Sequence, residues 1–187
     1  MCKKIYSFLA MVSCVALSNL SAQFTYVGAG GNYGTRIEEF GIGIYALYTI
    51  NKQIDIAPNV VYFFPHHVDL TDTRDGYEES IWWVVNLDGH YVITESSLYQ
   101  GYGLMGLSFT RTIEKYDYNL LGEQFRDKVF DTKLGLNIGV GGQLNLSDYF
   151  TPFAEVKFTF GEANQLGLTL GVIIRISPDK EREPDDF

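Results

Sequence analysis

The fold is decided by residues 165–176, which read QLGLTLGVIIRI. Large apolar side chains occupy every second position from Leu166 to Ile176, and the positions between them are mostly Gln, Gly, Thr and Arg. Successive side chains of a β-strand point to opposite faces, so this period of two predicts a strand with one apolar face. A helix would instead repeat its apolar residues every three to four positions.

Six further segments alternate in the same way, and their apolar faces carry no ionisable residue. They are residues 39–48, 54–64, 80–91, 99–110, 133–144 and 150–160. An eighth segment, residues 24–33, is rich in glycine and its facing is ambiguous. Most segments run about eleven residues, the length with which a tilted strand crosses a bilayer. The pattern predicts an all-β fold of eight antiparallel strands.

The second face of these segments separates a membrane barrel from a soluble one. It consists largely of Gly, Asn, Gln, Thr and Ser, with sparse charges of both signs. Those charges are Glu39, Asp55, Asp88, Lys133, Glu155, Lys157 and Arg175. A soluble barrel also alternates, but its wet face usually carries many Lys, Glu and Thr residues. Small residues suit a narrow barrel interior, and a Lys or Arg facing lipid costs about 2–4 kcal/mol. We therefore favour a transmembrane barrel over the soluble alternative.

Aromatic residues and connection lengths agree with this interpretation. Aromatic residues on the apolar face gather near segment ends, as in the interfacial girdles of membrane barrels. They are Tyr48, Tyr62, Phe64, Tyr91, Tyr99, Phe109, Phe150, Phe158 and Phe160. The short joins are residues 49–53, 92–98 and 145–149, and the joins that alternate with them are residues 33–38, 65–79, 110–132 and 161–164. Outer-membrane barrels keep short turns in the periplasm and long polar loops outside, which would place both termini in the periplasm.

The N-terminus has the features of a secretory signal peptide at residues 1–22. Two lysines precede an apolar run at residues 5–17, and residues 20–22 (Leu-Ser-Ala) form a small-residue cleavage site. The apolar run is too short for a spanning helix, which needs about 20 residues. Lipid attachment at Cys14 is the alternative. Both cysteines lie in this segment, so the mature chain is expected to have no disulfide and no cysteine metal site.

The charge of the mature chain excludes one class of partner. After removal of residues 1–22, 12 basic and 23 acidic residues remain, a formal charge of −11. Nucleic-acid binding requires basic patches, so we expect no nucleic-acid partner. Residues 177–187 are polar and too few to fold alone, and we expect them to form a periplasmic tail.

The signal peptide, the eight alternating segments and the loop asymmetry together resemble the family of small outer-membrane barrels of the OmpA and OmpX architecture. The resemblance covers residues 24–176. Residues 169–176 (TLGVIIRI) are also similar to the C-terminal signal read by the barrel-assembly machinery, although Ile174 and Ile176 stand where aromatic residues are usual and a tail follows. The resemblance implies an eight-stranded up-and-down transmembrane barrel at residues 23–176 in the outer membrane, with membrane lipids and the assembly machinery as partners.

A histidine pair followed by acidic residues is the first candidate for site chemistry. His66 and His67 precede Asp69, Asp72, Asp75, Glu78 and Glu79. Adjacent residues of a strand point to opposite faces, which makes shared metal ligation by the two histidines awkward. Arg74 also falls where a calcium loop needs a ligand. We favour a solvated surface loop, with no metal and no other cofactor.

A second candidate is the pair Asp88 and His90, two residues apart on one face. With a nearby serine it would suggest hydrolysis. We favour a structural role in a filled lumen, where charges pair with Lys133, Lys157 or Arg175. The sequence has no Gly-x-Ser-x-Gly elbow, phosphate loop or cysteine nucleophile, so we expect no catalytic residue and no enzyme activity.

The expected function is a structural or surface-interaction role, in envelope integrity or adhesion, with a filled lumen. An extracellular ligand would bind through residues 65–79 and 110–132. In the second of these loops, Tyr116, Tyr118, Leu120, Leu121 and Phe125 either contact a partner or pack on the neighbouring loop. The alternatives are a narrow channel or carrier for small or apolar solutes and, less favoured, a membrane-embedded lipid-modifying enzyme.

Overall fold

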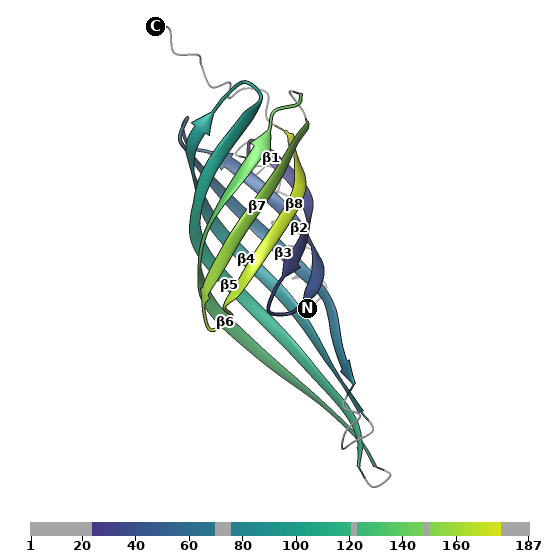
Figure 1. The fold of residues 1–187 in the computed structure, drawn as a ribbon. Coiled ribbons are helices and arrows are strands. Elements are labelled where there is room, and N and C mark those ends of the chain that lie inside the picture. The colour runs from purple at the N-terminus through teal and green to yellow at the C-terminus, as the bar shows by residue number, and fades with distance from the viewer. Residues whose placement is uncertain (1–23, 70–75, 121–122, 148–149, 177–187) are drawn as a thin grey trace, which may run out of the picture.

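The computed structural model describes residues 24–69, 76–120, 123–147 and 150–176, and it contains eight β-strands (Figure 1). They are β1 (Tyr26–Gly34), β2 (Glu39–Thr49), β3 (Ile54–Asp69), β4 (Gly76–Glu95), β5 (Tyr99–Leu120), β6 (Glu123–Leu144), β7 (Phe150–Gly161) and β8 (Gln165–Arg175). The predicted signal peptide and tail lie outside the described residues. In the part of the chain that is described, no helix is long and apolar enough to cross a membrane.

Each strand pairs with the next one along the chain in antiparallel orientation, and β8 pairs with β1 to close the barrel. The closing ladder runs from Tyr26 opposite Arg175 to Gly34 opposite Gly167. Closure leaves no strand edge within the barrel wall. The prediction of an all-β, eight-stranded, up-and-down antiparallel barrel is confirmed.

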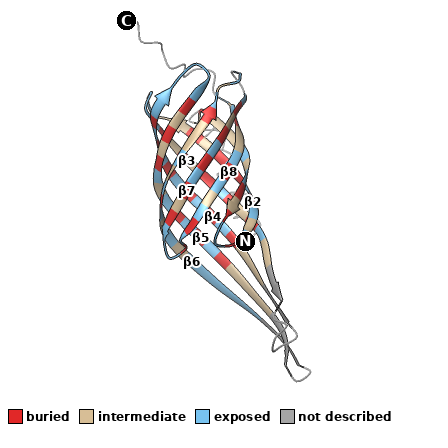
Figure 2. Cartoon of the chain, in the orientation of Figure 1, coloured by how far each residue is buried: buried red, intermediate tan, exposed pale blue. Residues whose placement is uncertain are grey.

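The barrel is inverted relative to a soluble protein. Its largest fully buried side chains are all polar: Asn86, Asn137, Thr110, Thr112, Asp55, Asp88 and Ser108. Large apolar residues face outward, for example Leu170 at 72% exposure and Ile44 at 72%. Figure 2 shows the resulting alternation of buried and exposed residues along each strand. A polar inside and an apolar outside are what a barrel wall in lipid requires, and they argue against the soluble alternative.

The apolar band has the height of a bilayer core. On β6 the outward positions run from Leu134 to Leu144, which is about 34 Å along the strand at about 3.4 Å per residue. A strand tilt of about 40° converts this to about 26 Å along the barrel axis, close to the band of about 25 Å in known membrane barrels. Exposed aromatic residues lie at both ends of the band, with Tyr91 and Phe150 at one end and Phe40 and Phe160 at the other.

Residues 65–79 and 110–132 are not the irregular loops that the sequence predicted. Strands β3 to β6 continue through most of both ranges and extend to one side beyond the barrel (Figure 1). The β5–β6 ladder continues from Arg111 opposite Thr132 to Leu120 opposite Glu123. Beyond the apolar band both faces of a strand are exposed to solvent. The alternation of apolar and polar residues is therefore lost there, although the backbone pairing continues. We call this extension of β3 to β6 the protruding sheet.

One short connection differs slightly from the prediction. Residues 92–95 belong to β4, so the connection to β5 shortens to residues 96–98. The turns at residues 35–38 and 162–164 lie at the same end of the barrel as the protruding sheet. The glycine-rich β1, whose facing was ambiguous, turns Asn32 into the barrel, where it is buried.

Candidate functional site

The centre of the lumen is occupied by a layer of hydrogen-bonded polar side chains. Asp88 is the hub: its Oδ2 accepts from Lys157 Nζ at 3.1 Å and from Asn59 Nδ2 at 3.3 Å, and its Oδ1 accepts from Asn137 Nδ2 at 2.8 Å. Asn86 links the amides, because it donates to Asn59 and accepts from Asn137. Side chains from β3, β4, β6 and β7 therefore meet across the lumen at this level.

The ion pair in this layer confirms the prediction that Asp88 pairs with a cation inside the barrel. It also shows which of the three candidate cations is the partner. The carboxylate of Asp88 pairs with Lys157 from β7. Lys133 instead pairs with Asp131 at 3.2 Å, and Arg175 donates to the hydroxyl of Tyr26 at 2.9 Å. Of the three predicted cations, Lys157 is the one that reaches Asp88. An ion pair buried this deeply leaves a costly lone charge if one partner is removed.

A second polar group lies between this layer and the short-turn end of the barrel. The hydroxyl of Tyr102 donates to Glu155 Oε1 at 2.8 Å, and the ring of His90 stacks on the Tyr102 ring with centroids 4.3 Å apart. His90 Nε2 lies 3.7 Å from the same Glu155 oxygen. A Cβ atom at Gly141 would come within 2.5 Å of the Tyr102 ring, so glycine there makes room for the ring.

The Asp88 and His90 pair therefore does not act as a unit. Although the two residues lie on one face of β4, Asp88 bonds to Lys157 and amides, while His90 stacks on Tyr102 near Glu155. Asp88 and His90, both of them described, do not hydrogen-bond to each other. Both side chains are buried in the wall-to-wall packing of the lumen. The structural role of Asp88 and His90, favoured over a hydrolytic one, stays a prediction.

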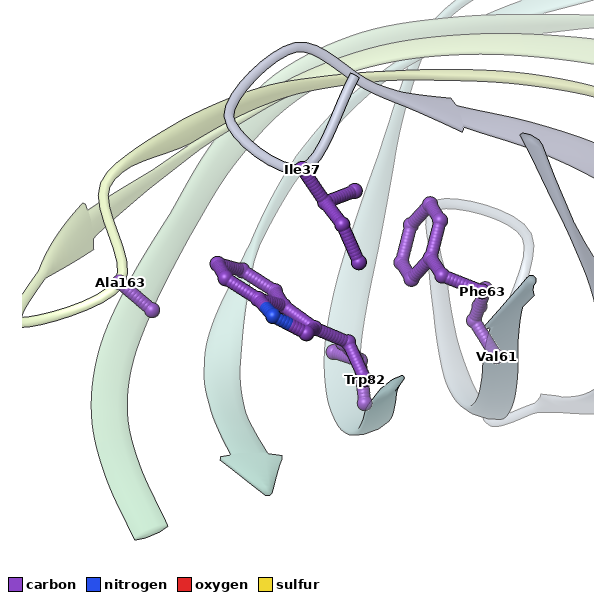
Figure 3. Packing of buried hydrophobic residues seen from close by; sticks show 6 residues of the cluster. Ile37, Val61, Phe63, Trp82 and Ala163 are labelled. Carbon is purple, nitrogen blue, oxygen red and sulfur yellow. The ribbon is translucent and has the colours of Figure 1, made fainter. Parts of the chain in front are cut away.

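Two apolar clusters inside the barrel were not anticipated by the sequence. The cluster at the end that carries the protruding sheet comprises Ile37, Val61, Phe63, Trp82, Val84 and Ala163 (Figure 3). The cluster nearer the short turns comprises Tyr45, Leu47, Ala57, Phe153 and Ile173. All except Ile37 and Ala163, which come from turns, occupy positions on the face that was interpreted as polar. Large apolar residues facing each other on β3 and β4 were the signal that sequence reasoning missed.

Two cavities inside the barrel are small. One cavity of about 20 Å³ adjoins the cluster near the short turns and is lined by Tyr45, His90 and Glu155 among others. Another of about 20 Å³ lies on the other side of the polar layer, next to Lys157 and Thr159. Each holds about one water molecule. At these two levels the side chains leave room for little more than water, as expected for an eight-stranded barrel.

The histidine and acidic residues near the protruding sheet are arranged as follows. His66 Nδ1 lies 2.9 Å from Glu39 Oε1 of β2. Glu79 pairs with Lys115 of β5 at 3.1 Å. The side chains of His67, Asp69 and Glu78, together with Asp72 and Asp75, lie outside the description. Within the residues whose side chains are described, no group of three His, Cys, Asp or Glu residues is placed to hold a metal ion.

Comparison with known proteins identifies the fold. No protein family and no curated protein matches the sequence. Solved structures do match: a major outer membrane protein of Thermus thermophilus (TM-score 0.63, 16% identity, 82% of this chain and 99% of that one) and Ail, the attachment invasion locus protein of Yersinia pestis (0.56, 14%, 82% and 97%). The N-terminal β-barrel domain of OprF from Pseudomonas aeruginosa matches with a TM-score of 0.50 and 17% identity, over 82% of this chain and 97% of that one. At these identities the likeness concerns the fold alone.

Proposed function

Because the chain has the fold of small outer-membrane β-barrels, we propose that it is an outer-membrane protein that acts by surface interaction, with a closed lumen and no enzymatic role. The protruding sheet is its binding element. This function combines the two features that dominate the structure: a lumen filled with side chains and a sheet that extends past the barrel wall.

The observation that carries this proposal is the free edge of β6. The ladder between β6 and β7 ends where Gly135 meets Gly161, whereas the ladder between β5 and β6 continues to Leu120 and Glu123. Within the described residues, no strand pairs with residues 123–134 on the side that β7 leaves. An edge strand offers a row of unpaired backbone groups, to which an extended segment of another protein can add as a further strand.

The same geometry supports an orientation in the membrane. The protruding sheet lies at one end of the barrel, and the short turns at residues 50–53, 96–98 and 145–147 lie at the other end with both ends of the described chain. Outer-membrane barrels keep short turns on the periplasmic side. We propose that the sheet is extracellular. Labelling intact cells with a membrane-impermeant maleimide should modify E162C but leave K52C unmodified, and the reverse pattern would overturn the orientation.

Binding by a small barrel of this fold has a precedent in Ail of Yersinia pestis, whose structure has also been solved in complex with the heparin analogue sucrose octasulfate. The partner of the present chain is proposed to be a protein segment that adds to the β6 edge. Edge addition depends on the backbone of the sheet, so it is separable from the charge of its side chains.

A shortened variant tests the proposal. Residues 112–131 are deleted, and Arg111 is joined to Thr132, its partner in the β5–β6 ladder, through an Asn-Gly turn. We expect vesicles carrying the full barrel to be retained on surfaces coated with extracellular matrix proteins, and vesicles carrying the shortened barrel to be retained no more than empty ones. Equal retention of both barrels, or no retention of the full barrel, would contradict the proposed function. Heat-modifiable gel mobility controls for folding of both variants.

A narrow channel is the second candidate, because the two water-sized cavities lie on opposite sides of the layer built around Asp88 and Lys157. In this alternative, movement of that layer would connect the cavities. The hydrogen bonds and the ion pair that hold the layer make the closed state the stable one. A solute-flux assay on liposomes that contain the barrel separates the two candidates.

A further inference from the structure

The outer wall has an apolar groove at the level where the protruding sheet begins. The groove has a volume of about 440 Å³ and is lined by Leu107, Ser108, Phe109, Leu134, Gly135, Leu136, Phe160 and Gly161. Its walls come from three neighbouring strands, β5, β6 and β7. The volume falls within the range of small-molecule binding sites.

The end of β7 creates this groove. Gly161 has a φ of 135°, a conformation that side-chain-bearing residues rarely adopt, and there the chain turns away from β6. Gly161 is the last β7 residue to pair with β6, opposite Gly135. The next outward residue of β6, Leu134, therefore has Phe109 beside it on β5 but no β7 residue opposite it in the ladder. The missing neighbour leaves a recess in the apolar surface.

A cation lies directly beyond the groove on the same face. Alternation along β5 points Leu107, Phe109 and Arg111 outward, and Arg111 follows Phe109 by about 7 Å along the strand. The Arg111 guanidinium lies 5.5 Å from the centre of the Phe130 ring. Arg111 is exposed and has no ion-pair partner among the residues whose side chains are described. Its hydrogen-bond donors are available to an external anion.

The surrounding charges strengthen this position. Lys115 and Lys128 are opposite each other in the β5–β6 ladder and lie further out on the same face. Glu79 pairs with Lys115, while the Lys128 side chain is exposed. Among the described side chains of this face, three cations accompany one carboxylate. The local excess of positive charge contrasts with the net charge of −9 of the whole chain.

We propose that the groove and Arg111 form a binding site for a phosphorylated lipid of the surrounding leaflet. One acyl chain lies in the groove, and the phosphate accepts hydrogen bonds from the Arg111 guanidinium at the edge of the apolar band. An arginine fork matches phosphate geometry, and an apolar recess facing a bilayer is filled by the acyl chains around it. The inference rests on the proposed membrane insertion but not on the proposed partner of the β6 edge.

The position of Arg111 explains why the site fits a lipid better than a free anion. Leu134 ends the unbroken apolar series of outward positions on β6, and Arg111 pairs with Thr132, the next outward position. Headgroup phosphates lie at this level when the band fills the bilayer core. A soluble polyanion would use the cations without the groove, so dependence on an acyl chain distinguishes the two ligands.

Native mass spectrometry of the folded barrel in a mild detergent tests the proposal with three probes. They are dilauroyl phosphatidate, dilauroylglycerol and glycerol phosphate, which separate the acyl chains from the phosphate. We expect phosphatidate to bind about tenfold more tightly than the diacylglycerol, which corresponds to the charge-assisted hydrogen bonds that it adds. Glycerol phosphate should not bind, because it has nothing to fill the groove.

Matched variants assign the binding to this site. R111Q should remove the preference for phosphatidate over the diacylglycerol, while K52Q, which removes one exposed cation at the short-turn end, should retain it. L134A should weaken the binding of both lipids, whereas L170A alters an equally outward-facing leucine on β8, outside the groove, and should not.

Three results would overturn the inference: glycerol phosphate binding as tightly as phosphatidate, an R111Q variant that keeps the phosphate preference, or equal losses in R111Q and K52Q. Failure of the proposed membrane insertion, on which the inference rests, gives a different result. In that case the wild-type chain would be absent from the outer-membrane fraction and would show no heat-modifiable mobility. An R111Q variant that inserts normally but keeps the phosphate preference would refute the lipid site alone.

Discussion

Removal of the lysine from the buried ion pair should strongly destabilise the barrel. In K157M, Asp88, which is 1% exposed, loses its contact with the lysine ammonium while Asn59 and Asn137 remain as neutral donors. Loss of one partner from a buried pair typically costs about 3–5 kcal/mol, because the remaining charge is neither solvated nor neutralised. Methionine preserves most of the length and apolar volume of the lysine stem, so the loss of packing contributes little.

The measurement is equilibrium unfolding by urea of the barrel in dilauroyl phosphatidylcholine vesicles, followed by tryptophan fluorescence. K157M should lower the free energy of unfolding by about 3–5 kcal/mol, and K52M, at an exposed turn position, by no more than about 0.5 kcal/mol. The double variant D88N/K157M removes both charges and should be more stable than K157M.

The reasoning is refuted if K157M costs less than about 1 kcal/mol, the scale of an ordinary surface pair. It is also refuted if D88N/K157M is as unstable as K157M, because the loss would then not arise from the unpaired carboxylate. In either case the buried ion pair would not stabilise the barrel in the way proposed.

Three more predictions concern the wall, the lumen and permeability. G161A should lower the free energy of unfolding by about 1–3 kcal/mol because of the φ of 135° at this position. G167A, where a Cβ would make only ordinary contacts, should be close to neutral in the same urea assay. Equal losses in the two variants would contradict the proposed role of Gly161 in ending β7. Y102F removes the hydroxyl that donates to the buried Glu155 and should lower the free energy of unfolding by about 1–3 kcal/mol. Y99F, at an exposed position, should lower it by less than about 0.5 kcal/mol. A neutral Y102F would show that this hydrogen bond does not stabilise the barrel. Liposomes containing the wild-type barrel should swell in arabinose no faster than empty liposomes, and a rate that rises with protein content would favour the channel over the closed lumen.

The wall of the barrel could be predicted from the sequence because lipid penalises every outward charge. The outward residues of β6 from Leu134 to Leu144 show this: none is ionisable, and the intervening residues turn inward. The facing of β1 could not be predicted in this way, because Gly28, Gly30 and Gly31 have no side chains that alternate. There the facing is set by the neighbours, because Asn32 accepts hydrogen bonds from the inward side chains of Tyr45 and Thr169.

The protruding sheet was not predicted from the sequence, because no lipid penalises charges outside the apolar band. Around Ile113, Glu114 and Lys115 both faces of the strand are outside the apolar band, so charges are tolerated on either side and the sequence resembles a loop. The strand persists because the backbone ladder and cross-strand contacts such as Lys115 with Glu79 continue. Hydropathy alone cannot distinguish a solvent-exposed hairpin from a solvent-exposed loop.

In the lumen, the sequence predicted an ion pair for Asp88 but left three candidate cations, of which one is the partner. It placed Asp88 among inward charges, yet the choice of Lys157 depends on the relative heights of β4 and β7, which are not neighbours in the barrel. The cluster around Trp82 and Phe63 could have been recognised, because both are large residues on the inward face of paired strands. Glu39 as the partner of His66 could not, because the contact joins β2 to the start of the protruding sheet.

The adjacent residues Trp82 and Trp83 offer the most direct test of an apolar wall facing lipid, because Trp82 is 6% exposed and points into the lumen while Trp83 is 43% exposed on the outer face. The measurement is fluorescence quenching of the single-tryptophan variants W82F and W83F in bilayers whose acyl chains are brominated near the glycerol end. W82F, which retains Trp83, should be strongly quenched, and W83F, which retains Trp82, should be protected. Equal quenching of both variants, or protection of Trp83, would contradict the assignment of the outer face to lipid.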